Sequence, residues 1–418
     1  MATRRHLILF GFGLLLLYVL MGVADVPFHG DESTTLNMAK DWFRMRQHGF
    51  SALYYHPNPS EPYAQDLRLL NGTIPSLSYA IMLDLAGLNG EALNNIWHWG
   101  EDWWVNQYYG SFPRADVLFI GRWTSALTLC LALALFFASA RLLVGIHRAF
   151  FAVLIIGLTP AVLLNGRRAV FEGATLLGLA LVWYAAAQLV TGKVRLGNWL
   201  FFGAACGIAL AAKHINLLLI MPTFAALLWY GRARLWQTLR ATALSALVMS
   251  AVFLAFNPSW WVVPWFMPQE VLRLRTNMLA IQNTLLGRPL TIGERLEALV
   301  AFPLGVPQYF EEVSQPWYDW LAESIQGYER GFQGIAWYTL APLVYVALIV
   351  GITTLPRLRT GAFIGITLLG MSVALLVTNT LMWQRYYLPL TFPLALLTTL
   401  GLTELAKLIR RALVARHV

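Results

Sequence analysis

Charged residues are scarce in this sequence of 418 residues. Lysine, arginine, aspartate and glutamate make up only 12% of it, whereas 58% of the residues are hydrophobic. A typical soluble domain is about a quarter charged. The composition therefore excludes an ordinary soluble protein and indicates an integral membrane protein.

Cysteine is nearly absent as well. The two cysteines, Cys130 and Cys206, both lie inside apolar runs, where we expect small buried side chains. They provide neither a disulfide framework nor the spacing of a metal site. We expect that no metal or other cofactor is required. The alternative is a metal held by His29, Asp31 and Glu32, although no spaced histidine and carboxylate motif accompanies them.

Ionisable residues are also missing from the middle of the apolar runs. Ten runs are apolar enough to form membrane spans: residues 7–24, 117–140, 149–166, 172–190, 197–212, 215–230, 241–256, 334–355, 361–382 and 386–404. The charged residues closest to them mark run boundaries: Arg122, Glu172, Lys213 and Arg385. Ion-coupled transporters usually need carboxylates at the membrane midplane, so this absence argues against a pump or symporter.

The charges that do occur are distributed unevenly. If all ten runs span, one membrane side carries 15 of the 30 basic residues and a single acid, Glu404, and the other 20 of the 21 acids fall on the opposite side. The 15 are Arg4, Arg5, Arg141, Arg148, Lys193, Arg195, Arg232, Arg234, Arg240, Arg357, Arg359, Lys407, Arg410, Arg411 and Arg416. The positive-inside rule then predicts a multi-pass protein of the cell membrane with both termini in the cytoplasm. The net charge of +9 reflects this orientation, and we expect no nucleic acid partner.

The first run leaves one alternative open. It is barely long enough to span, and Met21 to Ala24 resembles a signal-peptidase site. Both a retained anchor and a cleaved segment are compatible with this pattern. In either case the chain after Ala24 lies outside the cytoplasm.

Two long external loops separate the tightly spaced runs, at about 25–116 and 257–331. Long loops in a compact chain are usually functional. Apolar residues recur at helical spacing after Asp31, and the apolar stretch 74–88 is too short to span, so both segments are predicted to be helices lying along the membrane surface. We therefore expect one all-α polytopic domain over residues 1–418, with about ten transmembrane helices and membrane-parallel helices in the two loops.

Both loops are rich in aromatic side chains. The clusters are Trp97, Trp99, Trp103, Trp104, Tyr108 and Tyr109 in the first loop, and Trp260, Trp261, Trp265 and Phe266 in the second. Such clusters commonly mark the lipid headgroup region. A platform on which sugar rings stack is the alternative.

Two adjacent carboxylates, Asp31 and Glu32, open the first loop. Locally they read as a helix start, with Asp31 as the N-cap that accepts from the Ser33 or Thr34 N–H group and Glu32 in the favourable first turn. The functional alternative is a general base, or an anchor for a sugar hydroxyl. Further charged residues fall on the same outer face: Arg167, Arg168, Glu172, Lys213 and Arg385. A lone outer Arg or Lys commonly reaches lipid phosphates, but several on one face indicate a site.

Short motifs occur in a fixed order along the chain: Asp31-Glu32, NGTIPSLSYAIM (71–82), GRWTSALTL (121–129), Arg168 with Glu172, Lys213, FNPSWW (256–261) and Arg385-Tyr386-Tyr387-Leu388-Pro389. The ordered set resembles the GT-C class of membrane glycosyltransferases, in particular the dolichyl-phosphate-mannose-protein mannosyltransferases (family 39) and the aminoarabinose transferases. The likeness covers roughly residues 7–270 and 380–404. Ile74 stands where many relatives carry Lys, and Glu172 replaces the usual Asp.

The resemblance implies transfer of a sugar from a polyprenyl-phosphate donor to a glycan, lipid or protein acceptor at the outer membrane face. In that hypothesis Asp31 is the base that activates the acceptor, and Glu32 supports it. Arg168, Lys213 and Arg385 would bind the donor phosphate. Glu172 would bind sugar or acceptor, or pair with Arg168. The alternative is a non-catalytic or lipid-sugar-translocating membrane protein of the same fold.

Overall fold

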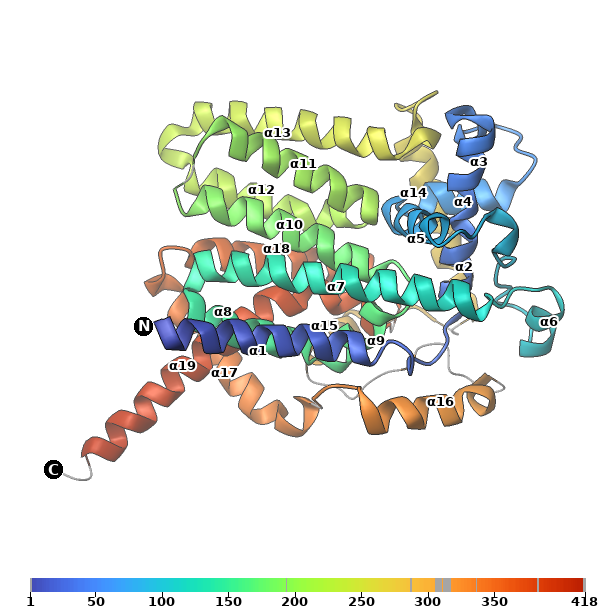
Figure 1. The fold of residues 1–418 in the computed structure, drawn as a ribbon. Coiled ribbons are helices and arrows are strands. Elements are labelled where there is room, and N and C mark those ends of the chain that lie inside the picture. The colour runs from blue at the N-terminus through green and yellow to red at the C-terminus, as the bar shows by residue number, and fades with distance from the viewer. Residues whose placement is uncertain are drawn as a thin grey trace.

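The computed structural model describes residues 2–192, 194–285, 288–304, 310, 317–335, 337–381 and 383–415. Its regular structure, within those ranges, consists of helices without a strand. The long helices lie roughly parallel to one another, and both chain ends lie at the same end of the bundle (Figure 1). Lys193 and Arg416, two of the predicted cytoplasmic basic residues, fall outside the described ranges, as does part of the second loop.

Every predicted run overlaps a helix or, in one case, a helix pair, although the run 334–355 begins before α17 and includes Ala336, which lies outside the described residues, and the run 386–404 begins before α19. The helices are α1 (Ala2–Met21), α7 (Ala115–Val144), α8 (Ile146–Gly157) with α9 (Pro160–Arg167), α10 (Glu172–Val190), α11 (Leu196–Ala212), α12 (Asn216–Tyr230), α13 (Leu235–Phe256), α17 (Ala341–Thr354), α18 (Gly361–Thr378) and α19 (Thr391–Ala415). Length and composition qualify five described helices as spans, or six if the bent α8–α9 pair counts as one. The all-α multi-pass architecture is confirmed, and the number ten stays a prediction.

The break between α8 and α9 has a local cause. Pro160 begins α9, and a proline disfavours helical backbone at the residue before it, so Thr159 is extended. The two helices meet at an angle of 67°. The turn that follows α9 carries Arg168 into the protein interior, where its side chain is buried.

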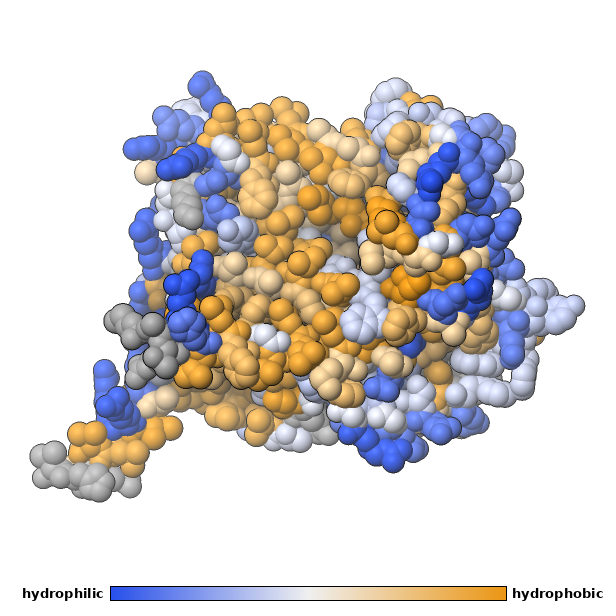
Figure 2. Space-filling model, in the orientation of Figure 1, coloured by the Kyte–Doolittle hydropathy of each residue, from blue (hydrophilic) through white to orange (hydrophobic). Residues whose placement is uncertain are grey.

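The surface confirms the membrane character. On the face shown in Figure 2, apolar side chains form a broad band across the middle of the bundle, and hydrophilic residues collect at its two ends. Large side chains such as Leu131 and Leu247 are 59% and 68% exposed. An apolar surface of this extent is stable against lipid rather than water.

The first loop packs against the end of the bundle opposite the termini (Figure 1). It forms α2 (Gly30–Met38), α3 (Lys40–His48), α4 (Pro62–Leu70), α5 (Ile74–Leu85) and α6 (Trp103–Tyr108), and the second loop contributes α14 (Met267–Leu285), α15 (Ile292–Ala301) and α16 (Trp317–Gly331). The single helix expected after Asp31 is divided at Ala39 into α2 and α3. Leu36, Ala39 and Phe43 are buried against α5 and α7, so the apolar face of this pair meets protein rather than lipid.

Candidate active site at the start of α2

His29, rather than Asp31, caps α2. Its Nδ1 accepts from the Asp31 N–H group (3.0 Å), and its own N–H donates to Glu32 Oε2 (3.1 Å). The prediction of Asp31 as N-cap is therefore wrong. The imidazole of His29, two residues earlier, is the side chain that accepts a hydrogen bond from the first turn of the helix. Asp31 lies inside the first turn, and its carboxylate is turned to another partner.

That partner is Arg385. Its Nη1 lies 2.6 Å from Asp31 Oδ2, across 354 residues of sequence. The Arg385 side chain is 5% exposed and that of Asp31 is 26% exposed, so solvent reaches the pair from the carboxylate side. Arg385 belongs to a 3₁₀ segment (Gln384–Leu390), and its guanidinium also lies over the rings of Trp383 and Tyr386, at 4.9 and 5.7 Å from their centroids.

Glu172 and Lys213 form a second ion pair. Lys213 Nζ donates to Glu172 Oε1 at 2.8 Å, at the point where α10 begins and α11 has just ended. The same Nζ lies 5.2 Å from the centroid of the Tyr386 ring. Tyr386 therefore contacts both cations and links the two ion pairs, with an attraction of about 0.5–2 kcal/mol for each cation over its ring.

Glu32 points elsewhere and is fully buried. Arg122 donates to both of its carboxylate oxygens, from Nε and Nη2, each at 2.8 Å, and the Ala169 N–H donates to Oε1 at 3.0 Å. Burial alone would raise the pKa of Glu32, but Arg122, together with Arg168 and the Ala169 N–H, outweighs it and holds this pKa below its usual range. Glu32 is thus an ionised structural anchor between α2, α7 and the turn after α9.

Arg168 completes the group. It is almost fully buried, and its Nε donates to the Pro27 carbonyl at 3.2 Å. Its positive charge adds to that of Arg122 in lowering the pKa of Glu32. Its neighbour Arg167 serves the fold: it donates to the Val19 and Tyr18 carbonyls and to the Tyr328 hydroxyl.

The structure therefore gathers all six predicted residues, with Arg122 added, around the first turn of α2. Asp31, Arg385, Lys213 and Glu172 are connected through Tyr386. Glu32, Arg122 and Arg168 form a second group, joined by the ion pair of Glu32 with Arg122 and by the charge of Arg168. Arg122 was missed as a site residue, although it stands at the start of the second predicted run within the motif GRWTSALTL. Among the described residues, no group of three or more His, Cys, Asp or Glu side chains is placed to hold a metal ion.

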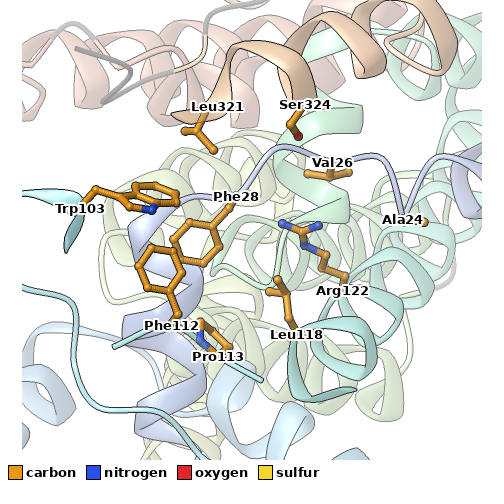
Figure 3. Close-up of a pocket in the computed structure, with 10 residues that line it drawn as sticks. All are labelled: Ala24, Val26, Phe28, Trp103, Phe112, Pro113, Leu118, Arg122, Leu321 and Ser324. Carbon is orange, nitrogen blue, oxygen red and sulfur yellow. The ribbon is translucent and has the colours of Figure 1, made fainter. Parts of the chain in front are cut away.

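A cavity of about 330 Å³ adjoins this group (Figure 3). It is lined by Ala24, Val26, Phe28, Trp103, Phe112, Pro113, Leu118, Arg122, Leu321 and Ser324. Phe28, Trp103 and Phe112 form an aromatic wall, with the closest ring centroids, those of Trp103 and Phe112, 4.6 Å apart. Part of the aromatic cluster of the first loop thus lies inside the protein rather than at the lipid headgroups. Trp97, for example, is only 2% exposed.

Comparison with known proteins gives matches in structure alone. No protein-family model and no curated protein sequence matches the chain. ArnT from Cupriavidus metallidurans is similar over 100% of this chain and 64% of its own, with a TM-score of 0.52 and 16% identity when bound to undecaprenyl phosphate, and 0.54 and 15% in the apo state. The archaeal oligosaccharyltransferase AglB from Archaeoglobus fulgidus, in complex with an inhibitory peptide and a dolichol-phosphate, matches 98% of this chain and 52% of its own (TM-score 0.54, 12% identity). The chain thus spans less than two thirds of the length of these proteins. They are GT-C glycosyltransferases, and this chain has the GT-C membrane fold that the motif order predicted.

Proposed function

We propose that this protein is an integral membrane glycosyltransferase that moves a sugar from a polyprenyl-phosphate-linked donor to an acceptor at the outer membrane face. The observation that carries the proposal is the connected set of Asp31, Arg385, Tyr386, Lys213 and Glu172 at the end of the bundle opposite the termini. The two structural neighbours that were solved with undecaprenyl phosphate and dolichol-phosphate support a lipid-phosphate donor.

The net charge of the site suits such a donor. Three carboxylates (Asp31, Glu32 and Glu172) face four cations (Arg122, Arg168, Lys213 and Arg385), and the charge of Arg275 also reaches Tyr386, so positive charge is in excess. A sugar-phosphate-polyprenyl diester carries one negative charge. That charge grows on the phosphate as the glycosidic bond breaks, and fixed guanidinium and ammonium groups stabilise it.

The Asp31–Arg385 pair suggests how donor and acceptor are coupled. A donor phosphate that takes hydrogen bonds from Arg385 would compete with Asp31 for the same Nη1 donor. Asp31 would then be released beside the bound sugar, with solvent access for an acceptor hydroxyl. Glu32 is held by Arg122 and backbone N–H groups, so its role is to position α2 rather than to take the proton.

The reaction is a single displacement that inverts the anomeric carbon. The acceptor hydroxyl gives its proton to Asp31 as its oxygen bonds to that carbon. The bond from the carbon to the phosphate oxygen breaks, and its electron pair stays on the phosphate. Paired carboxylates serve comparable displacements in glycosidases. Because the site and the two termini lie at opposite ends of the bundle, a site on the outer membrane face places both termini in the cytoplasm.

The test is Asp31→Asn in membranes given radiolabelled polyprenyl-phosphate sugars. We expect transfer to fall by about 10²–10⁴-fold, the usual contribution of a general base, with unchanged membrane expression. Asp116→Asn, which alters an exposed first-loop aspartate paired with Arg114, is the matched control and should transfer normally. Undiminished transfer by Asp31→Asn would refute the assignment. If the wild-type protein binds the labelled donor but no label reaches an acceptor, the non-catalytic or translocating alternative is favoured.

A further inference from the structure

The cavity beside Arg122 is not used by the chemistry proposed above. It lies between α6, the start of α7, α16 and the segment that leads from α1 to α2 (Figure 3). Its volume of about 330 Å³ is near the lower end of ligand pockets, which are about 300–1,000 Å³. That size suits a ligand as large as a monosaccharide.

Its walls combine aromatic rings with few polar groups. Phe28, Trp103 and Phe112 are only partly buried, so their rings are available on the cavity side. The Trp103 ring is stacked with the ring of Trp320, with the two ring planes 1° apart. Aromatic faces of this kind pack against the C–H faces of sugar rings while leaving the hydroxyl groups free for hydrogen bonds.

Arg122 supplies the polar contact. Its Nε and Nη2 donate to Glu32, whereas Nη1 donates to no described residue. The guanidinium points into the space between Val26 and Phe28 (Figure 3). The Arg122 side chain is 9% exposed, so Nη1 offers two N–H donors within a largely apolar wall. The Ser324 hydroxyl, on the opposite side, can donate or accept.

The charge state of Arg122 indicates which ligand fits. Glu32 neutralises it through two parallel hydrogen bonds, so the cavity presents donors that are already balanced in charge. A neutral ligand with hydroxyl groups satisfies such donors, whereas a phosphate is better served by Arg385 and Lys213. We propose that this cavity is a binding site for a neutral saccharide ring. That this saccharide is the acceptor rests on the proposed function.

The experiment is saturation-transfer NMR on the full chain with methyl glycosides of mannose, glucose, galactose and arabinose. The protein is kept in a zwitterionic detergent, because a maltoside would itself present sugar rings. Wild-type protein should transfer saturation to the ring protons of at least one glycoside. Ser324→Trp, which fills the cavity from an exposed position, and Trp103→Ala, which removes one wall, should each weaken binding about tenfold, equivalent to about 1.4 kcal/mol. Trp265→Ala is the control, because it changes a ring that is 80% exposed and does not line the cavity, and it should bind as the wild type does. Ser324→Ala keeps the cavity open and loses only one hydroxyl, so it should weaken binding less than Ser324→Trp does.

Three results would overturn the inference. One is the absence of transfer to any glycoside, and another is equal binding by Ser324→Trp and wild type. The third is a pattern in which farnesyl phosphate, but no glycoside, receives saturation from the wild-type protein and Ser324→Trp abolishes that signal. This pattern would show that the cavity binds lipid. Glycoside binding is read without the donor, so it is independent of the transfer assay. Glycoside binding without sugar transfer from the donor would support the saccharide site and refute the proposed function. Sugar transfer without glycoside binding in the cavity would support the proposed function and refute the saccharide site.

Discussion

Glu32→Gln should destabilise the protein more than Asp31→Asn does, because Glu32 is fully buried whereas the Asp31 side chain is 26% exposed. Glu32 is fully buried and accepts hydrogen bonds from Arg122 twice and from the Ala169 and His29 N–H groups. Glutamine keeps one acceptor oxygen and loses the charge, so Arg122 remains buried without its counter-ion. Removing one partner of a buried ion pair costs about 3–5 kcal/mol.

This loss is measurable as a fall in Tm. An unfolding entropy of about 2.1 cal/mol/K per residue gives about 0.9 kcal/mol per kelvin over the 418 residues, so 3–5 kcal/mol corresponds to about 3–6 °C. The assay is thermal unfolding of purified wild type and variant in the same detergent. Glu404→Gln is the matched control, because Glu404 pairs with the exposed Lys407 one turn along α19, and such surface pairs contribute less than about 1 kcal/mol.

The pH dependence supplies a second readout. The pKa of Glu32 is lowered in the folded protein, so its stabilising contribution is complete above the ordinary glutamate pKa of about 4.3 and is lost as the pH falls through the depressed value. The difference in Tm between wild type and Glu32→Gln should therefore be constant near neutral pH and shrink in acid. An unchanged Tm combined with lost transfer would refute the structural role and place Glu32 in the chemistry.

Three further substitutions test the rest of the site. Lys213→Met leaves Glu172 buried without its partner and should cost about 3–5 kcal/mol, whereas adding Glu172→Gln should restore Tm but not sugar transfer, as thermal unfolding and the radiolabel assay will show. Tyr386→Leu removes a ring that contacts both cations and should raise the KM for the donor severalfold, while Tyr386→Phe keeps the ring and should resemble wild type. Gly72→Ala forces a methyl group into the backbone at the end of α11 and should cost about 1–3 kcal/mol by thermal unfolding, but Gly13→Ala, whose new methyl group meets nothing within 4 Å, should not.

The positions of the helices could be predicted from hydropathy, because burying backbone in lipid requires long apolar helices. Each of the ten runs overlaps a helix or helix pair. The clustering of Asp31, Arg168, Lys213 and Arg385 at one end was likewise implied by charge and topology. The division at Ala39 was not, because both halves follow one helical period and only packing against α5 and α7 separates them.

The partners within the site could not be predicted. Lys213 and Glu172 are 41 residues apart, and Arg385 and Asp31 are 354 apart, so no local pattern encodes which cation meets which carboxylate. The sequence left Glu172 to bind substrate or to pair with Arg168, and the structure shows its ion pair with Lys213. Arg122 was read only as the boundary of a span, since its long-range partner Glu32 lies in the preceding loop.

Adjacency in sequence suggested that Asp31 and Glu32 act as a pair, and helix geometry separates them. Consecutive residues on an α-helix point about 100° apart, so they do not face each other. His29 sets the start of α2, and from that start Glu32 is directed inward to Arg122 and Asp31 toward Arg385. One carboxylate can thereby fix the helix in the protein while its neighbour stays within reach of solvent and substrate. A helix that began one residue later would bring Glu32 to the position that Asp31 now occupies, so the cap at His29 determines which of the two carboxylates is available for the proposed chemistry.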